Sequence, residues 1–202
     1  MVIYSKKIAY IHIRKCAGCS VIEAFKRAGY PLEWDTLNFG AYPVEAILAP
    51  RKEKFGKWDR ETYKDYKIFA TIRNPFDRLV SGYHYSQFGQ SFGSNKPLKF
   101  SEFIRQLPTR AGNFTWWTHL RMPMSSMLYD GEGLIVDRLV RFENLNEEFE
   151  SCCKWLGVKG VKLKKTNVSR PNNEYRSLYT SADKQLVYKI FEKDFDNFGY
   201  SF

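Results

Sequence analysis

Residues 8–20, IAYIHIRKCAGCS, decide the fold of this chain of 202 residues. The first six of them are mostly apolar and rich in isoleucine, which predicts a short β-strand. The remainder is a turn of mostly small residues with Lys15 at its mouth, and the apolar residues of 21–26 then recur on one side of a predicted helix. A strand, a small-residue turn and a helix start favour an anion-binding site, because backbone N–H groups and the helix dipole attract negative charge there.

The position of the lysine distinguishes this turn from the common P-loop. In a P-loop the lysine follows the glycines, whereas Lys15 comes before Gly18. The turn resembles the 5′-phosphosulfate loop, usually His-x-Pro-Lys-Thr-Gly-Gly-Thr-Ser, of the sulfotransferases that use 3′-phosphoadenosine 5′-phosphosulfate (PAPS). The sequence keeps His12, Lys15, Gly18 and Ser20 of that loop and departs from it at Arg14, Cys16, Ala17 and Cys19.

A second motif follows the next predicted strand, residues 68–73. Asn74 is a helix N-cap residue and Pro75 suits the first helical position, so Arg73 ends a strand and Ser81 lies about two turns into a helix. An arginine fork and a hydroxyl suit a terminal phosphate. Residues 73–83, RNPFDRLVSGY, resemble the 3′-phosphate motif of the same sulfotransferases, Arg-(Asp/Asn)-Pro-x-x-Arg-x-x-Ser-x-Tyr. The resemblance implies that Arg73 and Ser81 hold the 3′-phosphate, and Arg78 and Tyr83 are then structural or supporting residues.

The rest of the chain adds three elements to this resemblance. Residues 136–145 predict a third strand, followed by a helix that ends at Gly157. The RFENL sequence at residues 141–145 resembles the corresponding segment in the carbohydrate branch of the family. Residues 162–170 form a basic loop, and the resemblance implies that Ser169 and Arg170 lie over the nucleotide. A last helix is expected from about residue 181 to 197, with its apolar stripe used for packing.

The resemblance also implies roles in catalysis. Lys15 is the candidate to neutralise charge on the leaving 5′-phosphate, and the backbone N–H groups of Ala17, Gly18, Cys19 and Ser20 are the candidates to hold that phosphate. A base must accept the proton of the acceptor hydroxyl, and His119, in an aromatic stretch before the third strand, is favoured. Three carboxylates remain alternatives to it: Glu33, Asp35 and Glu45. No metal is needed for this chemistry.

Composition restricts the class of protein. The apolar fraction of 44% and the charged fraction of 27% fit one globular domain over residues 1–202. We see no apolar run of 18 residues and no signal peptide, and four cysteines do not suggest a disulfide framework, so we expect a cytoplasmic location. The net charge of +10 favours an anionic partner such as a nucleotide, an acidic glycan, nucleic acid or a membrane surface.

Two other functions fit parts of the sequence. Cys16 and Cys19 form a Cys-x-x-Cys at a strand-to-helix turn, which is also the setting of a thioredoxin-like redox motif. A basic module that binds nucleic acid or another polyanion would suit the net charge, although the basic residues are scattered and no recognised nucleic-acid motif is present. A zinc site is weaker, because the other two cysteines are adjacent on a predicted helix.

We therefore expect a single α/β domain with a mainly parallel β-sheet flanked by helices, the P-loop-like nucleotide-binding sulfotransferase fold. Its nucleotide would lie at the carboxyl ends of the first two strands. The expected reaction moves a sulfuryl group from PAPS to a hydroxyl acceptor, a carbohydrate above all, and releases adenosine 3′,5′-bisphosphate (PAP). No specific nucleic-acid partner is expected, and the chain resembles a soluble bacterial or viral member or a trimmed catalytic domain.

Overall fold

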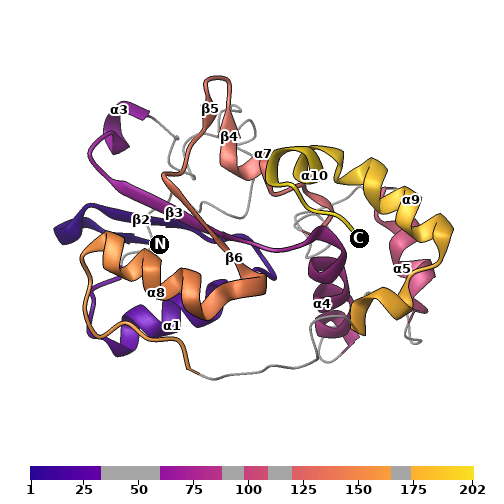
Figure 1. The fold of residues 1–202 in the computed structure, drawn as a ribbon, viewed down its shortest axis with the longest axis horizontal. Coiled ribbons are helices and arrows are strands. Elements are labelled where there is room, and N and C mark those ends of the chain that lie inside the picture. The colour runs from indigo at the N-terminus through magenta and orange to yellow at the C-terminus, as the bar shows by residue number, and fades with distance from the viewer. Residues whose placement is uncertain (33–59, 88–97, 109–119, 165–173) are drawn as a thin grey trace. The chain divides into compact units, whose positions relative to one another are not determined.

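The computed structural model describes residues 1–32, 60–87, 98–108, 120–164 and 174–202 (Figure 1). The chain divides into two compact units. Unit 1 comprises Met1–Ile72 and Ser126–Asn167, and unit 2 comprises Arg73–Ser125 and Val168–Phe202. The expectation of one domain over residues 1–202 stays a prediction.

Unit 1 contains a four-stranded sheet in the order β1-β2-β3-β6. Its strands are β1 (Val2–Ile3), β2 (Ile8–Ile11), β3 (Lys67–Ile72) and β6 (Arg138–Arg141). β3 pairs in parallel with β2 on one side and with β6 on the other, whereas β1 runs antiparallel to β2. The expected mixed α/β fold with a mainly parallel sheet is confirmed, and the first strand ends two residues before the apolar run does.

Two helices cover one face of this sheet (Figure 1). They are α1 (Gly18–Arg27) and α8 (Leu145–Leu156). α8 ends as predicted at Gly157, whose φ of 72° is the left-handed conformation that glycine adopts at low cost. Unit 1 also holds α3 (Arg60–Tyr63), the short helices η1 (Tyr4–Lys6) and η2 (Phe142–Asn144), and the antiparallel pair β4 (Tyr129–Asp130) and β5 (Gly133–Leu134).

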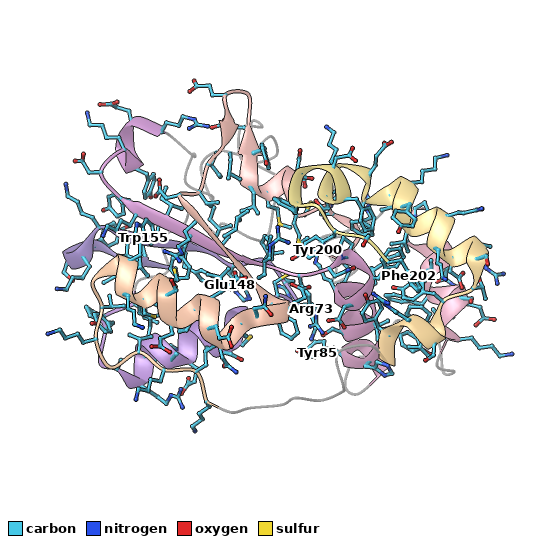
Figure 2. All side chains as sticks on the ribbon, in the orientation of Figure 1. Arg73, Tyr85, Glu148, Trp155, Tyr200 and Phe202 are labelled. Carbon is cyan, nitrogen blue, oxygen red and sulfur yellow. The ribbon has the colours of Figure 1, made fainter. Side chains whose placement is uncertain are left out.

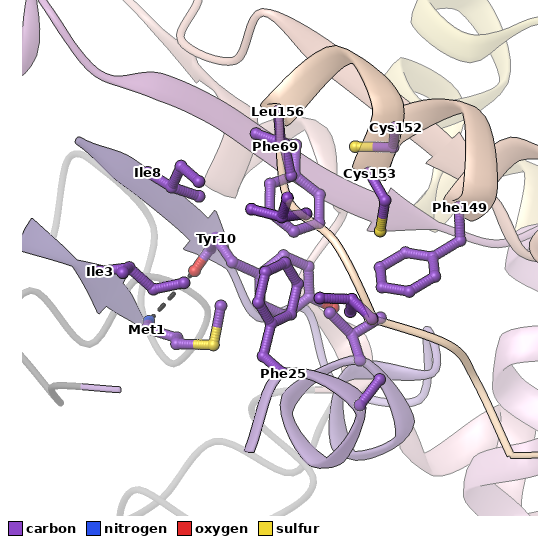
Figure 3. Packing of buried hydrophobic residues seen from close by; sticks show 14 of the residues in the cluster. Met1, Ile3, Ile8, Tyr10, Phe25, Phe69, Phe149, Cys152, Cys153 and Leu156 are labelled. Atoms are coloured by element: carbon purple, nitrogen blue, oxygen red, sulfur yellow. Dashed lines mark hydrogen bonds between the residues drawn. The ribbon is translucent and has the colours of Figure 1, made fainter. Parts of the chain in front are cut away.

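The core of unit 1 lies between that face and the two helices (Figure 3). Because side chains alternate along a strand, Tyr10 and Phe69 point to the same face, where their ring centroids lie 4.8 Å apart. Phe25 from α1 and Phe149 from α8 meet edge to face at 6.1 Å. The N-terminal ammonium of Met1 donates to the Tyr10 carbonyl at 3.2 Å, so β1 is held across β2. This packing holds β2, the strand that leads into the turn at residues 14–17.

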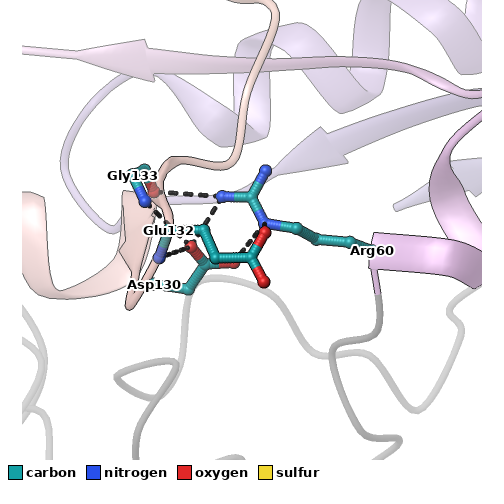
Figure 4. Close-up of polar contacts among 4 residues, drawn as sticks. All are labelled: Arg60, Asp130, Glu132 and Gly133. Atoms are coloured by element: carbon teal, nitrogen blue, oxygen red, sulfur yellow. Dashed lines mark hydrogen bonds and ion pairs between the residues drawn. The ribbon is translucent and has the colours of Figure 1, made fainter.

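A polar contact joins α3 to the β4–β5 turn (Figure 4). The Arg60 guanidinium donates from Nε and Nη2 to the two carboxylate oxygens of Asp130, at 2.8 and 2.6 Å. Asp130 also accepts from the N–H groups of Glu132 and Gly133, so one carboxylate shapes the turn and anchors α3.

Unit 2 is helical in its described part. Its helices are α4 (Pro75–Gln87), α5 (Phe100–Gln106), η3 (Glu174–Leu178), α9 (Ser181–Ile190) and α10 (Glu192–Phe198), and α7 (Ser125–Leu128) begins at its residue Ser125. Its core is aromatic, with Phe76 of α4, Phe103 of α5 and Phe191 all fully buried. Among the described residues, no helix is long and apolar enough to cross a membrane; the expected cytoplasmic location stays a prediction.

The prediction of one helix over residues 181–197 is wrong, because the chain bends at Phe191 and forms α9 and α10. The buried side chain of Asp194, three residues after the bend, contacts a distant part of the chain. Its carboxylate accepts from the backbone N–H groups of Met124 and Ser125 at 2.8 and 2.7 Å, and from the Ser125 hydroxyl at 2.7 Å. Apolar spacing could not predict this bend, because the spacing does not show that a buried carboxylate binds distant N–H groups.

Candidate functional site

The turn between β2 and α1 has an unusual backbone. Lys15 and Ala17 both have a φ of 66°, the left-handed conformation that non-glycine residues rarely adopt. The N–H of Cys16 donates to the Ile13 carbonyl at 3.3 Å, and the N–H of Val21 donates to the Ala17 carbonyl at 3.1 Å. The family loop that this turn resembles has glycine at the position of Ala17, which is the residue that this φ favours.

His12 packs against the first residue of α1. A Cβ placed on Gly18 would lie 1.9 Å from the His12 Cδ2 and 2.2 Å from its Nε2, so only glycine allows the ring to lie this close. Burial, the N-terminal ammonium and Arg14 lower the pKa of His12 to about 4. The imidazole at this helix start is therefore neutral at neutral pH.

The start of α1 presents donors to an anion. By helix geometry the N–H groups of the first turn, from Gly18, Cys19 and Ser20, have no carbonyl acceptor within the helix. The Cys19 side chain is exposed and that of Ser20 is half-buried, as is Lys15 in the turn. The turn thus combines backbone donors, the positive end of a helix dipole and one lysine, a combination that binds phosphate or sulfate groups.

Arg73 directly follows β3 in the chain and belongs to unit 2. Its Nε donates to the Asp77 carboxylate at 2.7 Å, with the two side chains 13% and 23% exposed. A bond to Nε fixes the orientation of the guanidinium plane, since the group is flat and rigid. Sequence reasoning missed this pair, although its spacing of four residues at a helix start could have indicated it. Ser81 lies two turns further along α4 and is half-buried.

The other residues of this second motif have structural contacts within unit 2. Asn74 caps α4 as predicted, because its side-chain oxygen accepts from the Phe76 N–H at 3.0 Å, and Pro75 is the first helical residue. Arg78 is fully buried and donates to the Met122 carbonyl at 2.8 Å. The Tyr83 hydroxyl donates to the Leu98 carbonyl at 2.7 Å. Arg78 and Tyr83 therefore support the helix, which fits the role that the motif suggested.

Some predicted site residues lie outside the described residues. They are His119, Ser169, Arg170 and the three alternative bases Glu33, Asp35 and Glu45. The loop residues Lys15, Ala17, Gly18, Cys19 and Ser20 lie together in unit 1. Arg73, two residues before α4, and Ser81, within α4, belong to unit 2. In the described ranges, no three His, Cys, Asp or Glu side chains gather as metal ligands.

The four cysteines are all free thiols. Cys16 is buried and Cys19 is exposed. Burial is the main cause that raises the pKa of Cys152 to about 12 and that of Cys153 to about 11, so both stay protonated at neutral pH and are poor nucleophiles.

Fold and turn define a class of protein: a mixed α/β protein with an anion-binding strand–turn–helix at the end of its first parallel strand. A family model described as the sulfotransferase family matches residues 1–201, so the chain belongs to the sulfotransferase family. The chain is also similar to the crystal structure of a sulfotransferase from Alicyclobacillus acidocaldarius. The identity is 14%, the TM-score is 0.50, and the match covers 96% of this chain and 98% of that one, so this likeness concerns the fold. A search of curated protein sequences found no match.

Proposed function

We propose that this sulfotransferase takes its sulfuryl group from PAPS and transfers it to a hydroxyl group of a carbohydrate. The observation that carries the proposal is the turn at residues 14–20, with Lys15 beside a helix start, in a chain that belongs to the sulfotransferase family. The second motif supports the 3′-phosphate as part of the donor, because Arg73 is held in a fixed orientation by Asp77. PAPS is here the donor substrate, and PAP is the product.

The reaction exchanges one sulfur–oxygen bond for another. The bond between sulfur and the bridging oxygen of the 5′-phosphate breaks, and a bond between sulfur and the acceptor oxygen forms. Negative charge develops on the leaving phosphate, and the proton of the acceptor hydroxyl passes to a base. As in phosphoryl transfer, positioning and electrostatic stabilisation supply most of the rate.

Each candidate residue has a role in this scheme. Lys15 neutralises the charge that develops on the leaving phosphate, and the N–H groups of residues 17–20 hold the 5′-phosphate. Arg73 and Ser81 bind the 3′-phosphate. Beyond the described part of the chain, Ser169 and Arg170 are proposed to contact the nucleotide, and His119 to act as the base, with Glu33, Asp35 and Glu45 as alternatives.

His12 is the histidine nearest to the turn, but its environment does not suit a general base. A histidine with a pKa of about 4 stays neutral, and its ring lies against Gly18, so packing is the role that its contacts support. A weak base that is already buried accepts a proton poorly at neutral pH. His12 is therefore proposed to shape the loop, and the base is sought elsewhere.

The alternatives of the sequence analysis receive less support. The redox function required a reactive pair at Cys16 and Cys19, but the family match covers the whole turn and assigns the chain to a transferase family. Cys16 is also buried, which restricts its access to a substrate disulfide. Binding of a polyanion remains compatible with a basic sulfotransferase, because acidic glycans are themselves polyanions.

The proposal is tested with radiolabelled PAPS in two assays. Equilibrium dialysis measures binding of the donor without any acceptor, and transfer of label is measured with a set of neutral and acidic oligosaccharides. We expect wild-type protein to bind PAPS and to label at least one oligosaccharide, with transfer falling about 10²- to 10³-fold in Lys15→Ala. Lys26→Ala, at an exposed position of α1, is the matched control and should leave transfer unchanged. Absence of PAPS binding at millimolar concentration would contradict the proposal.

A further inference from the structure

The cap of α4 is hydrogen-bonded to Ser201, near the last residue of the sequence. Both ends of the Asn74 side-chain amide are hydrogen-bonded: the oxygen accepts from the Phe76 N–H, and the nitrogen donates to the Ser201 carbonyl at 2.7 Å. The residue that caps the helix is therefore also bonded to a residue 127 positions away. Arg73 is the neighbour of Asn74 in the chain, so whatever holds Asn74 also limits the position of the Arg73 backbone.

The ring of Phe202, labelled in Figure 2, packs against residues of the same unit. Its centroid lies 4.8 Å from that of Phe76, in an edge-to-face arrangement, and 5.8 Å from that of Tyr179. Tyr179 and Phe76 also contact each other: their ring centroids lie 5.0 Å apart, and the Tyr179 hydroxyl donates to the Phe76 carbonyl at 2.8 Å. Aromatic pairs of this geometry stabilise more than their buried area alone predicts.

The backbone and the outer face of Phe202 are held as well. Its N–H donates to the Tyr188 hydroxyl at 3.0 Å. The Lys184 ammonium lies 3.8 Å from the ring centroid and the Arg176 guanidinium 5.6 Å from it, which are distances for cation–π interactions. Residues from α4, η3 and α9 thus converge on one phenylalanine, and this arrangement resists rotation of the ring.

Arg73 depends on the same turn for its orientation. Its guanidinium is bonded through Nε to Asp77, which is the third residue of α4. A shift of the first turn would move the Arg73 backbone and the Asp77 carboxylate together with Phe76. The orientation of the guanidinium therefore depends on how firmly Phe76 and Asn74 are held.

We infer that Phe202 is a positioning residue for the 3′-phosphate site: by packing against Phe76 while Ser201 binds Asn74, it holds the first turn of α4 and with it the Arg73–Asp77 pair. The inference rests on the proposed function, since it concerns the same Arg73. It assigns to residues 201 and 202 an effect on one phosphate group of the donor, beyond a general contribution to folding.

The test measures how much the 3′-phosphate adds to nucleotide affinity. Isothermal titration gives Kd for 5′-AMP and for PAP. The Kd of 5′-AMP divided by the Kd of PAP, called the affinity ratio, isolates the contribution of the 3′-phosphate. We expect Phe202→Ala to lower this ratio by roughly fivefold or more, because charge-assisted bonds to a phosphate weaken when the arginine is displaced. Phe202→Tyr should keep the wild-type ratio, because it keeps the aromatic ring.

A matched control separates positioning from loss of stability. Ile104→Ala removes a buried side chain from α5 of the same unit, so its Tm should fall while its affinity ratio stays at the wild-type value. If Phe202→Ala is too unstable to titrate, Phe202→Leu replaces it, with the same expected direction. A wild-type ratio in Phe202→Ala or Phe202→Leu would overturn the inference and leave the proposed function standing. A wild-type protein that binds PAP and 5′-AMP alike would overturn the proposed function itself.

Discussion

Replacement of Gly18 by alanine should be destabilising for one reason only, the ring of His12. The added Cβ would lie 1.9 Å from the ring carbon Cδ2, whereas ordinary contacts begin near 3.4 Å, so the ring must retreat by about 1.5 Å. Overpacking of this kind costs about 1–3 kcal/mol of unfolding free energy. Without the ring, alanine should be better than glycine in the helix by up to about 1 kcal/mol, because it reduces the entropy of the unfolded chain.

A double-mutant cycle measures this coupling directly. The free energy of unfolding is obtained from urea titrations of wild type, Gly18→Ala, His12→Ala and the double variant. We expect Gly18→Ala to destabilise the wild-type background and to be neutral or stabilising in the His12→Ala background, with a coupling energy of about 2–4 kcal/mol. If Gly18→Ala has the same effect in both backgrounds, within about 0.5 kcal/mol, the close contact between ring and helix start is refuted.

Three further variants test the electrostatics and backbone of the two units. Because the pKa of His12 in the folded protein, about 4, lies below its ordinary 6.5, unfolding stability should be complete above pH 6.5 and fall by at most about 3 kcal/mol as the pH drops from 6.5 to 4. His12→Asn should show a smaller loss over this range in urea titrations, and an unchanged pH dependence would contradict the assignment. Ala17→Gly should raise stability by about 1 kcal/mol, since glycine adopts a φ of 66° without strain; a decrease in Tm would refute this. Asp194→Ala should cost about 3 kcal/mol or more, because the N–H groups of Met124 and Ser125 lose their acceptor and the buried Arg78 loses a nearby carboxylate, and a loss below about 1 kcal/mol would show that the cluster is dispensable.

Local patterns in the sequence predicted the elements that depend on neighbouring residues. The strand before Lys15, the Asn74 cap with Pro75 after it, and the stop at Gly157 are all set by residues within one or two turns, and all are present in the structure. Apolar periodicity also gave the buried face of α8.

Contacts between distant residues were beyond such patterns. Beside the bend at Phe191, the Asp194 carboxylate accepts hydrogen bonds from N–H groups about 70 positions earlier, and the Asn74–Ser201 bond spans 127 positions. The close approach of His12 to Gly18 and the left-handed backbone at Lys15 were also missed, because neither is visible in the types of the residues around them. The antiparallel strand β1 was also missed, because two residues are too few to show a period.

The 3′-phosphate site at Arg73 is tested by titrating PAP and 5′-AMP into wild-type protein and into Arg73→Ala. We expect PAP to bind wild-type protein at least about tenfold more tightly than 5′-AMP, because a charged hydrogen bond to the extra phosphate is worth about 1.5–3 kcal/mol. In Arg73→Ala the two nucleotides should bind with nearly equal affinity, while binding of 5′-AMP stays close to that of wild type. Equal affinities in the wild-type protein, or an unchanged preference for PAP in Arg73→Ala, would contradict the assignment of a 3′-phosphate site at this arginine.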